Sequence, residues 1–315
     1  MDQNLNIQTK PIKPYASQDD FELTIARMAK IGSCLFPSFS PDGSHISLVS
    51  DLNGLPQVWI VPTEGGWPEL VTTMEDQVFR AQWSPSGEWI SFSLAPGGGM
   101  NRQIYVIRPD GTDLRLLTNG GKENNWLGPW THDGQKLCIA SNLRSPTAMD
   151  AYLVDPQDGK LRLISENQGV GYFTDISRDG EWAIIYRMVN RSNNDLFLVH
   201  IQTGEEVLLT PHEGPGTFVS GYFSPDGQSI YLASNRDRDM IAFCQIELDE
   251  NRQPGPEKVI LAREGADLQE FKIAEDGKLV ALLWNNAGES ELSFFHLGEM
   301  EDSPADDLPG EIATD

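Results

Sequence analysis

The residue types that hydrolyse peptides or esters do not occur in a recognisable arrangement in this chain. The nucleophile elbow G-x-S-x-G is absent, and the nearest approach, GESEL at residues 288–292, lacks the final glycine that a sharp strand-to-helix turn beneath a serine requires. The zinc motif H-E-x-x-H is also absent, and the five histidines are scattered along the chain. We therefore expect no catalytic residue, no metal site and no cofactor in this chain.

Two other segments resemble ligand-binding loops only in part. Residues 235–239 (NRDRD) have the alternating oxygen donors that begin a calcium loop, but Met240 and Ile246 stand where such a loop needs glycine and glutamate. Residues 97–99 are three glycines, but no G-K-[ST] follows them, as a phosphate-binding loop would require. Both segments are therefore interpreted as ordinary loops.

A set of arginines is the sequence feature that best suggests binding. They lie in long, dissimilar loops that follow the second strand of a repeated unit, and such variable loops on a rigid scaffold commonly carry function. If these loops gather on one face, the arginines form a rim that docks a second domain or an acidic ligand; the alternative is that they are solvated loop charges. The candidate binding residues are Arg102, Arg144, Arg191, Arg236 and Arg238.

The unit that positions these loops occurs six times. Each copy has an apolar strand, a tight turn of the Ser-Pro-Asp-Gly type and two or three further strands. The six turns read SPDG (40–43), SPSG (84–87), THDG (131–134), SRDG (177–180), SPDG (224–227) and AEDG (274–277). Their glycines lie 44 to 50 residues apart, and a period of that length built from strands and turns is typical of propeller blades.

The fold class predicted from this repeat is all-β: a β-propeller of about six four-stranded blades, with a truncated seven-bladed ring as the alternative. A large apolar residue stands immediately before each turn, and we expect it to fill the gap between neighbouring blades. These pre-turn residues are Phe39, Trp83, Trp130, Ile176, Phe223 and Ile273.

Three segments are expected along the chain. Residues 1–33 form an N-terminal arm with a short helix over residues 18–31, where apolar residues follow Asp19 and Asp20. Residues 34–298 form the propeller. Residues 299–315 form an acidic tail or truncated linker, because a fourth strand in the sixth unit is replaced by a run rich in acidic residues and proline.

Composition narrows the function classes. The chain has 23 basic and 47 acidic residues, a net charge of −24, which argues against nucleic acid and against anionic membranes as partners. Three widely spaced cysteines, Cys34, Cys138 and Cys244, fit reduced, buried thiols better than a disulfide framework. With no secretory or membrane-spanning segment in the sequence, we expect a cytoplasmic protein.

The repeat, F-S-P-D-G-x-x-I-x-x-x-S followed by Q-V-W-I-V and L-V-T at residues 39–72, resembles TolB-like propellers of the WD40-like kind, although the WD dipeptide is missing. It also resembles the N-terminal propeller of prolyl oligopeptidase-family serine peptidases, above all the acylaminoacyl-peptidase branch. The resemblance covers residues 18–298, and the lead-in with Asp19 and Asp20 favours the peptidases.

This resemblance implies a non-catalytic domain that filters peptide substrates for an α/β-hydrolase domain. The serine, aspartate and histidine of that domain match no part of this chain, and such propellers commonly have seven or more blades. The implied partners are the hydrolase domain, in the same chain if it is longer, and peptides. The alternative is a stand-alone TolB-like propeller that binds a protein partner.

Overall fold

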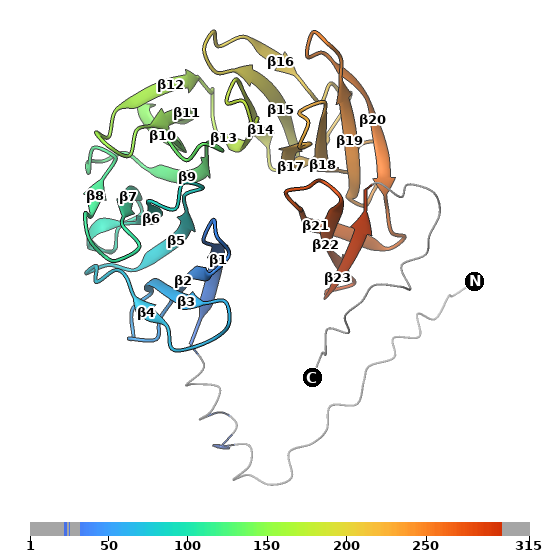
Figure 1. The fold of residues 1–315 in the computed structure, drawn as a ribbon. Coiled ribbons are helices and arrows are strands. Elements are labelled where there is room, and N and C mark those ends of the chain that lie inside the picture. Colours follow the sequence, from blue (N-terminus) through green and yellow to red (C-terminus); the bar gives the residue numbers. More distant parts are fainter. Residues whose placement is uncertain (1–21, 24, 26–31, 298–315) are drawn as a thin grey trace.

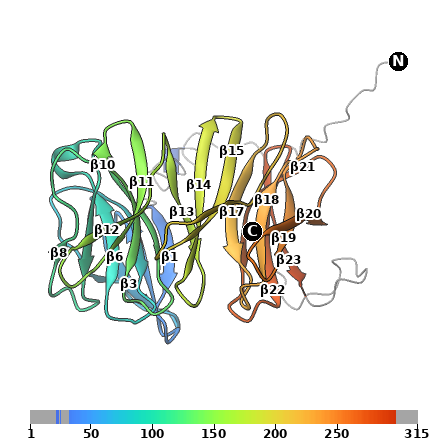
Figure 2. The same cartoon turned by 90° about the horizontal axis from the view of Figure 1, so that it is seen from above.

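Six small antiparallel sheets are arranged around a central axis in the computed structural model, which describes residues 22, 23, 25 and 32–297 (Figures 1 and 2). The first three blades are β1–β4 (Cys34–Phe39, His45–Ser50, Gln57–Pro62, Glu69–Leu70), β5–β8 (Val78–Trp83, Ile90–Leu94, Gln103–Ile107, Arg115–Leu116) and β9–β12 (Asn125–Trp130, Leu137–Ser145, Ala148–Val154, Leu161–Ser165). The next two are β13–β16 (Gly171–Ile176, Trp182–Asn190, Asn193–His200, Glu206–Leu208) and β17–β20 (Phe218–Phe223, Ser229–Ser234, Ala242–Leu248, Pro254–Leu261). The sixth has three described strands, β21–β23 (Ala266–Ile273, Leu279–Asn286, Glu289–His296).

Each turn between the first and second strands of a blade is fixed by its own side chains. In the first blade Ser40 Oγ donates to Asp42 Oδ1 at 2.6 Å, and Gly43 has a φ of 70°. The backbone N–H and side chain of Ser44 also donate to Asp42, and with Ser40 they lower the pKa of that carboxyl to about 2. The same serine or threonine to aspartate bond recurs at Thr131, Ser177 and Ser224, so the repeated sequence produces a repeated local structure.

The core lies between blades. Ile90 and Phe92 of β6 are fully buried and pack with Val49 and Val58 of the first blade. Comparable clusters join the later blades in turn. Because the first strand of each blade from the second to the sixth lies against the blade before it, side chains from two sheets are needed to exclude water from one interface.

This arrangement confirms the all-β propeller with six blades, and the sixth blade lacks a fourth strand among the described residues. Figure 1 shows the ring of described residues open between the first blade (blue) and the sixth (red). Five of the six pre-turn residues are buried or half-buried, as expected. Phe39 is different: it is 63% exposed, because no described blade precedes β1 and covers it.

Several expectations fall partly outside the described residues. Of the predicted helix over residues 18–31, only Glu22, Leu23 and Ile25 are described, all with helical backbone. The other residues of the arm up to residue 31, and the tail at 299–315, lie outside the described residues. Cys138 and Cys244 are buried as expected, whereas Cys34 on β1 is exposed. Within the described part of the chain, no helix is long and apolar enough to cross a membrane.

Candidate binding channel

Polar side chains from the first strands join neighbouring blades around the axis of the ring. We define the seam residues as those immediately before the pre-turn residues: Ser38, Gln82, Pro129, Asp175, Tyr222 and Lys272. Ser38 Oγ accepts the backbone N–H of Trp83 at 3.0 Å, and Gln82 Nε2 donates to the carbonyl of Gly128. The seam residue of one blade therefore satisfies a backbone group of the next, as buried backbone groups require.

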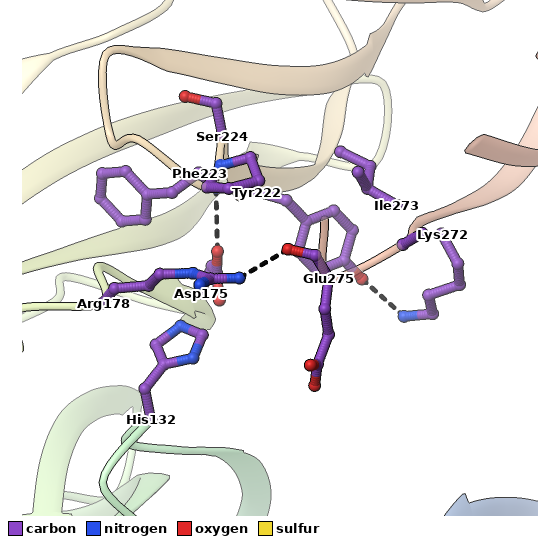
Figure 3. Close-up of a pocket in the computed structure, with 11 residues that line it drawn as sticks. His132, Asp175, Arg178, Tyr222, Phe223, Ser224, Lys272, Ile273 and Glu275 are labelled. Atoms are coloured by element: carbon purple, nitrogen blue, oxygen red, sulfur yellow. Dashed lines mark hydrogen bonds between the residues drawn. The ribbon is translucent and has the colours of Figure 1, made fainter. Parts of the chain in front are cut away.

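The seam continues on the other side of the ring. Asp175 Oδ2 accepts the backbone N–H of Phe223 at 2.9 Å, and Lys272 Nζ donates to Tyr222 Oη at 2.8 Å (Figure 3). In the third blade the seam residue is Pro129, and there His132 Nε2 lies 3.1 Å from the carbonyl oxygen of Ile176 in the fourth blade instead.

A cavity of about 530 Å³ lies along the axis, inside this seam. It is lined by residues of the second to sixth blades, mostly from their first strands. It shares Tyr222 and Lys272 with a smaller cavity of about 180 Å³, shown in Figure 3, that reaches His132 and Arg178 near the Ser-Pro-Asp-Gly turns. Cavities of this size accommodate a small ligand or a short peptide segment.

The charged residues that line the larger cavity are Arg80, Arg102 and Lys272. Arg80 is accessible to solvent but lies inside the ring, where the surrounding protein lowers the pKa of its guanidinium by desolvation; the attraction of Tyr222 and Glu270 opposes this in part. Arg102 lies over the ring of Phe79, with its guanidinium carbon 4.4 Å from the ring centre. The cavity is thus cationic in a strongly acidic protein.

Aromatic side chains form one wall of the same cavity. Trp126 and Tyr172 have ring centres 6.3 Å apart, and Tyr172 stacks on Tyr186 at 4.6 Å. Burial raises the pKa of Tyr172 to about 12, so its phenol keeps its proton at neutral pH. This wall offers apolar area and a hydroxyl group beside the cations.

Asp175 is the seam residue with the most perturbed ionisation. Burial raises its pKa to about 7, although the backbone N–H groups of Phe223 and Ile176 and the charge of Lys272 act in the opposite direction. A carboxyl group with such a pKa beside a histidine can mark a catalytic site. The serine that lines the smaller cavity with them, however, is directed elsewhere: Ser224 Oγ donates to Asp226, and Figure 3 shows it pointing away from His132 and Asp175.

The channel can therefore hold a ligand, but its described residues supply no serine–histidine pair that would attack one. Also within the described residues, no group of three or more histidine, cysteine or carboxylate side chains could hold a metal ion. Asp175 is best explained as a structural acceptor between the fourth and fifth blades.

The structure brings only one of the five predicted rim arginines, Arg102, to this cavity. Arg144 forms a two-point ion pair with the fully buried Asp150, with its Nε 2.7 Å from Oδ2. Arg191 is exposed in the turn between β14 and β15. Arg236 lies 3.9 Å from Asp237, and Arg238 donates to the carbonyl of Arg236. Whether these residues bind a ligand stays a prediction.

Sequence reasoning missed Arg80, Lys272 and Asp175. A usable signal was present, because all three are charged residues within the apolar first strands. Aligning the six units on their turns would have placed Asp175 and Lys272 at the same position, just before the pre-turn residue.

No protein-family model matches the chain. It is 26% identical over 222 residues to the uncharacterised peptidase YuxL of Bacillus subtilis, a match that covers 68% of this chain and 31% of the relative. It is 24% identical over 218 residues to dipeptidyl aminopeptidase BIII of Pseudoxanthomonas mexicana, covering 66% and 31%. This chain thus spans about a third of the length of the curated relatives it matches.

A solved structure of a prolyl endopeptidase shares the fold. It has a TM-score of 0.70 and 17% identity, and the match covers 92% of this chain and 45% of that one. TolB propellers are also among the similar solved structures. The resemblance expected from the Ser-Pro-Asp-Gly repeats, to TolB-like propellers and to peptidases of the prolyl oligopeptidase type, is confirmed.

Proposed function

We propose that this chain is the non-catalytic propeller of a cytoplasmic serine peptidase of the prolyl oligopeptidase type, where it limits which peptides reach an α/β-hydrolase domain. The observation that carries the proposal is the similarity of two thirds of the chain to two peptidases, of which it matches less than a third. Within this class, the acylaminoacyl-peptidase branch is part of the proposal.

The geometry of the channel supports the same role. A cavity of about 530 Å³ on the axis accommodates a short stretch of extended peptide but not a folded protein. The hydrogen bonds between seam residues hold neighbouring first strands together, so the width of the channel is set by the blades. We expect a channel bounded in this way to select substrates by size.

The first test is to read the coding sequence downstream of Asp315 and to assay the purified 315-residue chain on acyl-peptides. The proposal expects an in-frame continuation that encodes G-x-S-x-G, and no hydrolysis by the 315-residue chain alone. A stop codon directly after Asp315, or cleavage by the chain itself, contradicts it. The stop codon would favour the stand-alone TolB-like binding module.

The second test narrows the channel in the peptidase that contains this propeller. Thr174 lines the cavity and is half-buried, so Thr174→Trp fills part of the space, whereas Thr174→Val keeps the size of the side chain. We expect Thr174→Trp to lower kcat/KM for peptides of ten residues by roughly 10-fold, a change of about 1.4 kcal/mol in the barrier, while dipeptide substrates are cleaved as before. Equal loss for both substrates would contradict selection by the channel.

A further inference from the structure

The described residues that line the central cavity include three cations and no carboxylate. Its charged lining residues, Arg80, Arg102 and Lys272, come from the second and sixth blades, in a chain with 47 acidic and 23 basic residues. Some arginines elsewhere in the fold form ion pairs, such as Arg144 with Asp150 and Arg187 with Glu206. Three positively charged side chains therefore lie around one cavity of a protein whose net charge is strongly negative.

No carboxylate in the described part of the chain lies within ion-pair distance of either arginine of the channel, although the charge of Glu270 attracts Arg80 from farther away. Among the described residues, Arg80 makes no ion pair or hydrogen bond with its guanidinium, and Arg102 contacts only the face of Phe79 with its own. Lys272 is partly engaged: its Nζ is 2.8 Å from Tyr222 Oη and 3.8 Å from Glu270 Oε1. A guanidinium that is partly desolvated and unpaired gains most from a bound anion.

The cavity also has a place for an apolar group beside the cations. Trp126 and Tyr172 line it together with Leu127 and Phe173, and the two aromatic rings lie 6.3 Å apart. An anion without apolar atoms, such as phosphate, would leave this wall unused. A carboxylate attached to a bulky apolar group would use both parts.

We infer that the central cavity binds peptides through a carboxylate group, which Arg80 grips with its planar fork of N–H donors while a neighbouring apolar side chain packs on Trp126 and Tyr172. Arg102 and Lys272 add positive charge to the same site. The choice of a peptide, rather than another carboxylate, rests on the proposed function. The site makes acidic peptides, or peptide C-termini, the preferred occupants of the channel.

Isothermal titration of the 315-residue chain tests the inference with two matched peptides. Acetyl-Phe-Glu carries two carboxylates, and acetyl-Phe-Gln-amide carries none but has nearly the same shape. We expect the acid to bind and the amide to bind at least 10-fold more weakly. Arg80→Gln should weaken binding of the acid by roughly 10- to 100-fold, the range for a hydrogen-bonded charge, and Arg80→Lys should lose less.

Arg162→Gln is the matched control, because Arg162 is an exposed arginine on the outer strand β12 that bonds Gln202 and does not line the cavity. It should bind the acid as the unmodified chain does, and thermal unfolding of all variants should agree within a few degrees. Equal binding of both peptides, no binding of the acid, or equal losses in Arg80→Gln and Arg162→Gln would overturn the inference. So would phosphate that displaces acetyl-Phe-Glu at equal concentration, which would mark a general anion site.

The titration measures binding alone and needs no peptidase activity. A failure here leaves the proposed control of access intact, since that is tested by the cleavage of long and short peptides. Conversely, if the chain proves to be a stand-alone propeller that binds acetyl-Phe-Glu, the carboxylate site is supported and the peptidase function is contradicted.

Discussion

The first blade and the inner blades have the same kind of pre-turn residue in the sequence, but that residue is exposed in the first blade and buried or half-buried in the inner ones. Phe39, Trp130 and Ile176 each stand immediately before the turn of their blade, yet Phe39 is 63% exposed whereas Trp130 is 7% and Ile176 0% exposed. The difference lies outside the repeat, in whether another sheet covers that face. A blade thus forms its own strand ladders, but it is only half of a unit of hydrophobic burial.

The thiols should show this contrast most strongly. Cys34 on β1 is exposed, whereas Cys138 and Cys244 are buried in inner blades, where desolvation raises the pKa of both thiols. In a native labelling experiment with a maleimide, we expect Cys34 to react on the order of 100-fold faster or more than the other two. Mass spectrometry of peptic fragments gives the three rates, and similar rates would show that the inner interfaces open as readily as the edge.

Truncation of the pre-turn residues measures the same contrast in free energy. Ile176→Ala leaves a cavity between the third and fourth blades, where Ile176 packs with Cys138 and Ile185, and should lower the free energy of unfolding by about 2–5 kcal/mol. Phe39→Ala removes a larger side chain but should cost less than about 1 kcal/mol, because the ring is already hydrated. Urea unfolding followed by circular dichroism compares them, and a larger cost at Phe39 would mean that something covers β1.

The stability contributed by an inner blade should depend on pH in a range where that of the first blade does not. The pKa of Asp175 is raised to about 7 from an ordinary 3.8, so between about pH 4 and 7 the folded protein holds this proton while the unfolded chain has released it. The stability that this proton contributes is present below pH 4 and is lost as the pH rises through 7. Asp175→Asn keeps an oxygen that can accept the Phe223 N–H and carries no charge.

We therefore expect Asp175→Asn to melt a few degrees higher than the unmodified chain at pH 8, and to change less between pH 5 and pH 8. Asp42→Asn in the first blade is the control: the pKa of Asp42 is lowered to about 2, so its loss should leave the change between pH 5 and 8 unaltered. Scanning calorimetry at four pH values between 5 and 8 measures the melting temperature of each variant. Identical pH profiles for Asp175→Asn and the unmodified chain would show that Asp175 is ionised in the folded protein.

The repeated part of the fold could be predicted from the sequence because it depends on local chemistry. The Ser-Pro-Asp-Gly turns can be recognised in the sequence because their hydrogen bonds, such as that from Ser40 to Asp42, join residues within four positions. The apolar strands flank these turns at fixed sequence distances. The site could not be predicted in this way. Arg80 and Lys272 are almost 200 residues apart in the sequence, and they line the same cavity only because the blades are arranged in a ring around it.

Which side chains of the first strands face the next blade could also not be predicted from alternation, for a physical reason. The pairing of first and second strands shifts register between Val78 and Arg80, between Phe173 and Asp175, and between Leu268 and Glu270. Each shift changes which side chains face the next blade. A strict alternation of inward and outward positions therefore assigns the wrong face to residues on one side of each shift.

The opening between the first and sixth blades makes the described fold a row with two ends rather than a closed circle (Figure 1). In a row, each inner blade is held by two neighbours and each end blade by one, so a blade can detach from an end without breaking more than one interface. Amide hydrogen exchange should then be fastest in β1–β4 and β21–β23 and slowest in the third and fourth blades. Whatever joins the two ends would convert this graded, end-first melting into a single cooperative event.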